Sequence, residues 1–223
     1  MAKLTRASTL TGLLSLFIAA GLAGGPSSAF EIGFMQGVAD FRAGHPQLTA
    51  VVGGITDLGG AYATLGLTAV ASLWLLVGKK PAWALLLTLT VLLERALVEA
   101  LKDWMGRPRP HLGVDLLPTS LAFPSGHAAN SMTAFLAAAL IVAPPIYRGP
   151  WVAGALLLTF VVGLSRIYLG VHWPSDVIGG WTLGLLSVSI ALMIGRKSGA
   201  LPIEPQHQIV GRHVPALDED EAA

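Results

Sequence analysis

Six apolar stretches, each close to the length of a membrane-spanning helix, dominate this sequence. They cover 10–24, 58–77, 82–101, 127–143, 151–164 and 177–194. A helix needs about 20 mainly apolar residues to cross the hydrocarbon core of a bilayer. The chain is 53% hydrophobic and only 12% charged, which is far from the balance of a soluble domain. The pattern predicts an all-α fold: an integral membrane bundle of six transmembrane helices.

The first apolar stretch has two interpretations. It follows Lys3 and Arg6 and precedes small residues at 26–29, a pattern that fits a cleaved signal peptide or a retained membrane helix. We favour the retained helix. Either interpretation places the next segment on the far side of the membrane, so the topology of the rest of the chain does not depend on this choice.

Two polar segments lie outside the predicted spans, one after the first span and one after the last. Apolar residues recur at helical spacing among the charged residues of 31–46, which predicts an interfacial amphipathic helix after the first span; a simple surface linker is the alternative. Residues 1–197 are predicted to form one transmembrane domain. The polar segment 198–223, which ends in four acidic residues and Ala222-Ala223, is predicted to be a disordered tail.

Positive residues outside the spans predict the orientation in the membrane. By the parity of six crossings one side receives Lys3, Arg6, Lys79, Lys80, Arg148, Arg196 and Lys197. Such an excess is typical of the cytoplasmic side. The chain is therefore predicted to be a multi-pass protein of the cytoplasmic (inner) membrane. The loops after the third and fifth spans then open on the same non-cytoplasmic face.

Composition excludes several functions. The chain has no cysteine, hence no disulfide, thiolate nucleophile or cysteine metal site. Its net charge is +1 and its cations are scattered, which argues against a nucleic-acid partner. Near the basic residues of the non-cytoplasmic face only Asp103, Asp115 and Asp176 offer carboxylates, so we predict no metal and no cofactor.

Three cations, Lys102, Arg109 and Arg166, lie at predicted helix ends on that face. Guanidinium and ammonium groups suit phosphate oxygens, although any one of these residues could simply mark a helix end. Ser125 and Gly126 begin the fourth span. A helix start with a glycine is a ready anion site, and a plain N-cap is the alternative.

Two histidines complete the candidate site. His127 and His172 could divide the chemistry, one attacking phosphorus and the other protonating the leaving oxygen. Asp176 follows His172 by one helical turn and could fix its tautomer. Taken alone, His172 would instead be an interface anchor. Arg95 and Glu99, near Glu94 in the third span, form either an internal ion pair or a support for Lys102.

These stretches resemble the signature of the type 2 phosphatidic acid phosphatase (PAP2) family of membrane lipid phosphatases. The signature is lysine, six residues, arginine-proline; then proline-serine-glycine-histidine; then serine-arginine, five residues, histidine, three residues, aspartate. All eleven fixed positions are present, in order, between Lys102 and Asp176.

The resemblance implies a role for each residue. His172 would be the nucleophile that forms a phosphohistidine, Asp176 would orient it, and His127 would protonate the leaving group and later activate water. The phosphoryl oxygens would be held by Lys102, Arg109, Ser125, Gly126 and Arg166. The role of Arg107, an extra cation, stays open; contact with a second phosphate is one option.

The predicted substrate is a lipid phosphate or diphosphate, either undecaprenyl diphosphate or a phosphatidate-like lipid, hydrolysed at the outer membrane face. Membrane lipids are the other predicted partners. Substrate choice would depend on a groove between helices and on 31–46. A protein that binds or transports a lipid phosphate without hydrolysis is the alternative.

Overall fold

The computed structural model describes residues 2–110, 112 and 120–197, and every regular element in that part of the chain is a helix. The side chains of residues 2–6 are not part of this description. The predicted disordered tail, 198–223, and most of the loop after Pro110 lie outside the described residues.

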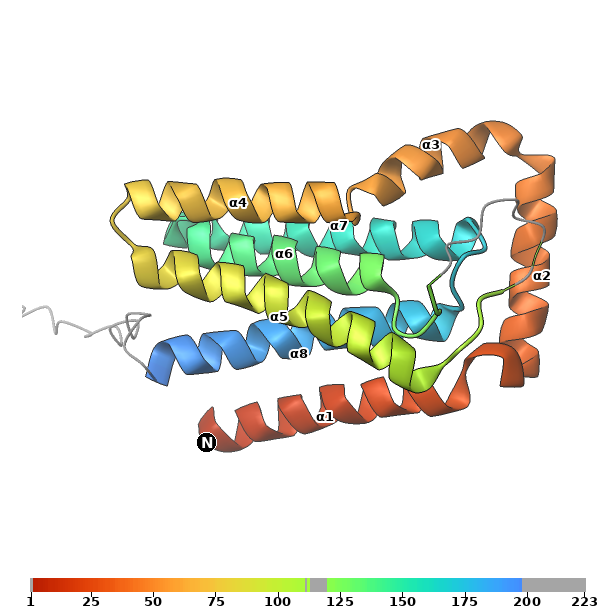
Figure 1. Cartoon of the computed structure of the whole chain (residues 1–223), viewed down its shortest axis with the longest axis horizontal. Coiled ribbons are helices and arrows are strands. Elements are labelled where there is room, and N and C mark those ends of the chain that lie inside the picture. Colours follow the sequence, from red (N-terminus) through yellow and green to blue (C-terminus); the bar gives the residue numbers. More distant parts are fainter. Residues whose placement is uncertain (1, 111, 113–119, 198–223) are drawn as a thin grey trace, which may run out of the picture.

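The helices follow the predicted apolar stretches closely, and the elements are drawn in Figure 1. Each of the six predicted spans coincides with one helix, to within four residues at either end except that α1 begins eight residues before the first span. The α-helices are α1 Ala2–Ala23, α2 Ala29–Gly44, α3 Pro46–Asp57, α4 Ala61–Val77, α5 Pro81–Met105, α6 Gly126–Val142, α7 Arg148–Tyr168 and α8 Pro174–Lys197. Two 3₁₀ turns, η1 Gly25–Ser27 and η2 Pro145–Tyr147, join neighbouring helices.

The structure does not confirm the predicted count of six membrane spans. In the described residues three segments are long and apolar enough to cross a bilayer: Pro46–Val77, which combines α3 and α4, Pro145–Tyr168 and Pro174–Lys197. Ala7–Ala23 and Gly126–Val142 are shorter apolar helices. The bundle is therefore that of a multi-pass membrane protein, and the count of six spans stays a prediction.

Helix α6 is the centre of the bundle and packs against α4, α5, α7 and α8. Thirteen of its 17 residues are buried, many of them alanine, so its neighbours approach closely. A Cβ at Gly180 of α8 would lie 2.5 Å from the Ser125 carbonyl oxygen, and one at Gly184 would lie 2.7 Å from Met132 Cβ. The small residues on this face of α8 therefore allow close packing against α6.

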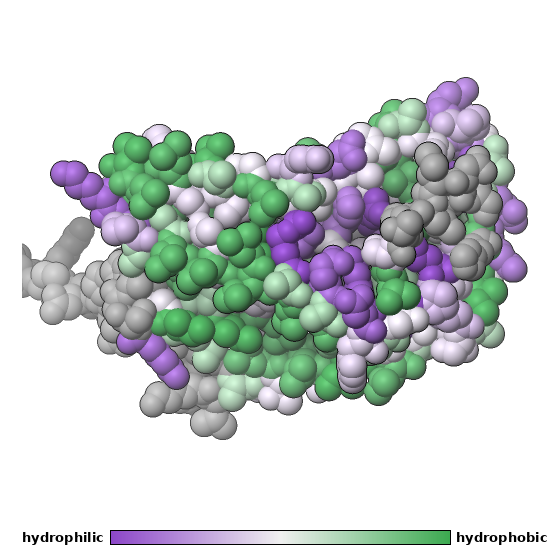
Figure 2. Space-filling model, in the orientation of Figure 1, coloured by the Kyte–Doolittle hydropathy of each residue, from purple (hydrophilic) through white to green (hydrophobic). Residues whose placement is uncertain are grey.

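The outer surface of the bundle is apolar. Large side chains such as Leu73 (62% exposed), Leu93 (65%) and Leu157 (65%) point away from the core. On the face in Figure 2, hydrophobic residues cover much of the bundle, and hydrophilic residues gather toward the C-terminal half of α5. This distribution suits a helical surface that lies in lipid.

Helix α2 lies across one end of the bundle, at a steep angle to the other helices (Figure 1). It confirms a helix within 31–46; its place at the membrane surface stays a prediction.

Helix α3 was not predicted, because Gly53 and Gly54 weaken the helical signal of its sequence. The turn after α3 needs a glycine: a Cβ at Gly59 would lie 2.5 Å from Val162 Cγ1 and 3.0 Å from the His127 carbonyl oxygen.

The connections that carry the signature residues meet at one end of the bundle. The α5–α6 and α7–α8 connections both lie at the end where α2 crosses, and the α1–α2 and α3–α4 turns lie there too (Figure 1). The contacts described below show that the signature stretches meet, and the membrane face on which they open stays a prediction.

Candidate active site

The loop after α5 carries Arg109 to the α7–α8 connection. Helix α5 ends at Gly106, whose φ of 61° is the left-handed conformation that glycine adopts without strain. Arg109 Nη1 then donates to the Val171 carbonyl (2.6 Å) and lies 3.0 Å from His172 Nε2. Its other donors contact the Ser120 carbonyl (2.6 Å) and hydroxyl (2.9 Å). Arg109 is thus fixed beside the predicted nucleophile.

His172 is 2% exposed and lies between two charged groups. Its Nδ1 is 3.4 Å from Asp176 Oδ2. With the proton on Nδ1, the single lone pair of Nε2 accepts the hydrogen bond from Arg109. Burial, then the charges of Arg109, Arg166 and Lys102, hold the pKa of His172 well below 6.5. Burial likewise lowers the pKa of Arg109. The imidazole is therefore neutral, as a nitrogen nucleophile must be.

Asp176 closes the first turn of α8, which starts with Pro174. Its Oδ2 accepts from the Trp173 N–H (2.8 Å), the contact that an acidic residue makes in a capping box. Its Oδ1 accepts from Arg107 Nη1 (2.8 Å). The carboxylate is fully buried, so these bonds and His172 determine its orientation.

The start of α6 lies directly beside this turn. The Ser125 N–H donates to the Asp176 backbone carbonyl (2.9 Å), which joins two signature stretches. Ser125 is the N-cap, as predicted, yet its hydroxyl makes no cap bond and is buried without a partner in the described part of the chain. A Cβ at Gly126 would lie 3.5 Å from Lys102 Nζ, so the ammonium rests against the glycine. A helix N-terminus with a free hydroxyl and a nearby cation has the groups needed to bind an anion.

Lys102 pairs with Glu99 at 2.8 Å, and Arg95 instead donates to Thr64 Oγ1 (3.3 Å). Of the two interpretations left open, the support of Lys102 is therefore the one that the structure favours.

Arg166 and His127 complete the cluster. Arg166 Nη1 donates to Thr56 Oγ1 (2.9 Å), whereas its buried Nε has no partner among the described residues. His127, the second residue of α6, packs against the α3–α4 turn at Gly59. Arg166, His172 and the other two cations are near enough to His127 to act on it electrostatically. All eight predicted site residues thus gather at one end of the bundle.

Arg107 contacts this cluster at Asp176. Its donors are taken by Asp176, Ser175 and the carbonyls of Ala20 and Gly21, which argues against the option of contact with a second phosphate.

Several neighbours of the site carry no sequence signal that we used. They are Glu31, Thr56, Ser120 and Ser175. Only Ser175, next to Asp176, could have been suspected from its position. In the described residues no three histidine and acidic side chains gather to hold a metal ion; the absence of a metal stays a prediction.

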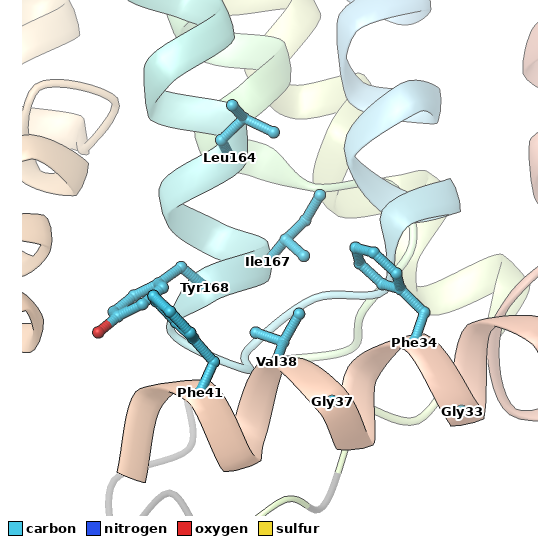
Figure 3. A pocket seen from close by; sticks show the side chains of 8 residues that line it. All are labelled: Gly33, Phe34, Gly37, Val38, Phe41, Leu164, Ile167 and Tyr168. Carbon is cyan, nitrogen blue, oxygen red and sulfur yellow. The ribbon is translucent and has the colours of Figure 1, made fainter. Parts of the chain in front are cut away.

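An apolar groove of about 440 Å³ lies between α2 and the C-terminal part of α7, the helix that also carries Arg166. Figure 3 shows side chains of both helices bordering it, with Ile167 and Tyr168 only one and two residues after Arg166. It is lined by Gly33, Phe34, Gly37, Val38, Phe41, Leu164, Ile167 and Tyr168.

Comparison with known proteins agrees with the signature. The sequence model of the PAP2 superfamily matches residues 83–199. Phosphatidylglycerophosphatase B of Bacillus subtilis is 33% identical over 146 residues, 63% of this chain and 72% of the relative. Undecaprenyl-diphosphatase of Sulfolobus acidocaldarius is 43% identical over 77 residues, but the alignment covers only 33% of this chain and 35% of that relative.

The fold also matches a solved membrane phosphatase. The crystal structure of a transmembrane PAP2-type phosphatidylglycerolphosphate phosphatase from Bacillus subtilis superposes with a TM-score of 0.75 and 28% identity, covering 84% of this chain and 96% of that one. Signature, family match and fold agree, and the chain belongs to the PAP2 superfamily as a membrane lipid phosphatase.

Proposed function

We propose that the chain removes the phosphate from a glycerophospholipid phosphomonoester through a phosphohistidine intermediate on His172. The observation that carries this proposal is the environment of one imidazole. His172 Nδ1 faces Asp176 at 3.4 Å while Nε2 lies 3.0 Å from Arg109, so with the proton on Nδ1 the lone pair of the ring is on Nε2, beside the cations.

In the first step Nε2 attacks phosphorus, and the bond from phosphorus to the lipid oxygen breaks. Arg109 transfers its hydrogen bond from Nε2 to a phosphoryl oxygen as the N–P bond forms. His127, protonated in the presence of the anionic substrate, gives its proton to the leaving alkoxide. Asp176 stabilises the positive charge that develops on the ring of His172.

In the second step His127 takes a proton from water, and the resulting hydroxide attacks phosphorus. The N–P bond breaks, inorganic phosphate leaves and His172 returns to its neutral form. Lys102, Arg166 and the start of α6 stabilise the negative charge of both transition states. The unpartnered Ser125 hydroxyl and Arg166 Nε supply further hydrogen bonds to the phosphoryl group.

The apolar groove between α2 and α7 takes an acyl chain of the lipid. Its lining is almost entirely apolar, and it begins on the same turn of α7 as Arg166. The head group then reaches the cations while the chain stays among apolar side chains. This assigns part of the substrate choice to α2.

The protein has six transmembrane helices, α1 and α4 to α8, in the cytoplasmic membrane, and the site opens on the non-cytoplasmic face. Both statements rest on the apolar stretches and on the distribution of lysine and arginine. Cysteine labelling from outside intact cells, at Asp40→Cys against Lys79→Cys in this cysteine-free chain, tests the orientation. Labelling of residue 79 alone would contradict it.

Undecaprenyl diphosphate is the second candidate substrate, because a relative of that activity shares 43% identity over 77 residues. The monoester is favoured, because the longer alignment is with a phosphatidylglycerophosphatase and because Arg107 is not free to bind a second phosphate.

The test is phosphate release by purified protein in detergent with excess EDTA. The panel holds phosphatidylglycerophosphate, phosphatidate, lysophosphatidate and undecaprenyl diphosphate. We expect release from the first two by wild type and none by His172→Ala. Folded protein that binds every lipid but releases no phosphate would instead favour the binding or transport alternative. Faster phosphate release from undecaprenyl diphosphate than from the monoesters would make the diphosphate the favoured substrate.

A further inference from the structure

Asp176 has a charged neighbour that is not among the signature residues. Arg107 Nη1 donates both to Asp176 Oδ1 (2.8 Å) and to Ser175 Oγ (2.8 Å). The side chains of Arg107 and Asp176 are only 6% and 0% exposed. A buried ion pair of this kind contributes little net stability, because both charges lose their hydration. Its placement behind a catalytic carboxylate suggests another role.

The other side of the guanidinium is attached to the end of α1. Arg107 Nη2 donates to the carbonyls of Ala20 (3.0 Å) and Gly21 (2.5 Å), and Cζ lies 4.6 Å from the centre of the Phe123 ring. Carbonyls of a last helical turn have no donor within their own helix. Arg107 therefore bridges the end of α1 to Asp176.

Glu31 of α2 supports the same bridge from a third direction. Its carboxylate accepts from the Ser175 N–H (2.7 Å), the Ser175 hydroxyl (2.9 Å) and the Gly25 N–H (2.5 Å). The α1–α2 turn fits this arrangement only with glycine. A Cβ at Gly25, whose φ is +81°, would lie 2.9 Å from Arg107 Cδ. We call Glu31, Ser175 and Arg107 the positioning chain.

We propose that Arg107, backed by Ser175 and Glu31, is a positioning residue of the phosphatase reaction, which holds Asp176 where its carboxylate accepts the Nδ1 proton of His172. The inference rests on the proposed function. With Oδ1 fixed by Arg107 and one lone pair of Oδ2 taken by the Trp173 N–H, the other lone pair of Oδ2 is left for the imidazole.

The inference gives the first two helices a part in catalysis. Neither α1 nor α2 carries a signature residue, yet α1 supplies two carbonyls and α2 a carboxylate to the positioning chain. A purely structural role for Arg107 would instead lower stability without acting through Asp176.

Substitution of Arg107 tests the inference. We expect Arg107→Ala to lower kcat by about 10- to 100-fold with little change in KM. This is the size of loss seen when a residue that orients the ligand of a catalytic metal is removed, and Arg107 orients Asp176 in a similar way. Arg107→Lys should retain part of the lost kcat, since an ammonium keeps the positive charge but not the two-pronged geometry of the guanidinium. The matched control is Arg42→Ala. Arg42 also donates to two carbonyls, of Tyr168 (2.9 Å) and Leu112 (2.8 Å), without touching Asp176.

Two readouts separate positioning from stability. In Arg107→Ala the groups facing Asp176 are His172, the Trp173 N–H and, farther off, Arg109, with Glu31 behind Ser175. Loss of the positive partner favours the protonated carboxyl, so the acidic limb of the kcat profile should move to higher pH. In an Asp176→Asn background, Arg107→Ala should cause only a small part of its usual loss of kcat. Arg42→Ala should show neither effect.

Arg107→Ala protein that is monodisperse, unfolds cooperatively and retains wild-type kcat would overturn the inference. So would losses that are fully additive with Asp176→Asn. Should neither Arg107 variant fold, Ser175→Ala carries the test: we expect a several-fold lower kcat, and an unchanged kcat would overturn the positioning chain. Wild-type protein that releases no phosphate would count against the proposed function, since the inference concerns only how an active site is held.

Discussion

Two helices begin at the active site, and their first turns are treated in opposite ways. At the start of α8, the carboxylates of Asp176 and Glu31 accept the N–H groups of Trp173 and Ser175. At the start of α6, the Ser125 hydroxyl makes no cap bond and Lys102 rests against Gly126. The α8 start is already neutralised by protein carboxylates, whereas the α6 start is left for an anion. We therefore expect the substrate phosphate to bind at α6 and the start of α8 to hold the proposed catalytic groups in place.

The largest effect should come from the α8 side. We expect Asp176→Asn to lower kcat by about 10³-fold or more, because an amide cannot stabilise the imidazolium and can favour the wrong tautomer of His172. The measurement is steady-state phosphate release from the preferred lipid. Wild-type turnover by Asp176→Asn would remove Asp176 from the reaction.

The α6 side should show a loss of binding without a loss of stability. We expect Ser125→Ala to weaken inhibition by orthovanadate, a phosphate mimic, by about tenfold or more, since a hydrogen bond to a charged group contributes about 1.5–3 kcal/mol. Its unfolding midpoint should not fall, because the wild-type hydroxyl is buried without a partner in the described residues.

Ser131→Ala is the matched control for this substitution. It removes another buried hydroxyl of α6, one that donates to the Ala128 carbonyl at 3.2 Å. Equal vanadate inhibition of Ser125→Ala and Ser131→Ala would show that the α6 start does not bind the phosphate.

Glu31→Gln should lower stability without weakening phosphate binding. An amide can accept only some of the three bonds made by the Glu31 carboxylate, so we expect the free energy of unfolding to fall by about 1–3 kcal/mol. Vanadate affinity should change little. Thermal unfolding in detergent measures the effect, with Asp40→Asn, an exposed position on the same helix, as the control. Equal midpoints for the two variants would contradict the role of Glu31 as a cap of α8.

The smallest effect concerns pH. Because the folded protein holds the pKa of His172 well below 6.5, the unfolded chain binds the proton first as the pH falls. This contribution to stability is complete above about pH 6.5 and is lost below it, at up to about 1.4 kcal/mol per pH unit. Unfolding midpoints between pH 7.5 and pH 5 should therefore fall more steeply for wild type than for His172→Ala. Parallel slopes would show that His172 is not buried as a neutral group.

The residues of the candidate site were more predictable from the sequence than the residues that hold them in place. Charged and histidine residues are costly in an apolar chain, so the spacing of the signature and the parity of the spans indicated which groups meet. Their contacts bear this out: Arg109 lies 3.0 Å from His172, and Ser125 bonds to the Asp176 backbone.

The residues that hold the site in place are brought there by packing between segments distant in the sequence. Glu31 looked like a polar residue of a surface helix, and only the course of the α1–α2 turn places it against Ser175. The role of Arg107 stayed open because spacing along the chain does not say which way a side chain turns. Helix α3 was missed because its two glycines weaken the pattern that reveals a helix.

The central claim is that His172 becomes phosphorylated, and trapping of the intermediate tests it most directly. Wild-type protein and His127→Ala protein, in which formation of the intermediate is slowed and its hydrolysis is impaired, are mixed with phosphatidylglycerophosphate carrying ³²P in its terminal phosphate and quenched in alkali. We predict protein-bound label that is stable in base and labile in acid, and no label in the His127→Ala, His172→Ala double variant. Equal labelling of both variants, or release of phosphate by wild type with no labelled protein at any time, would contradict the claim.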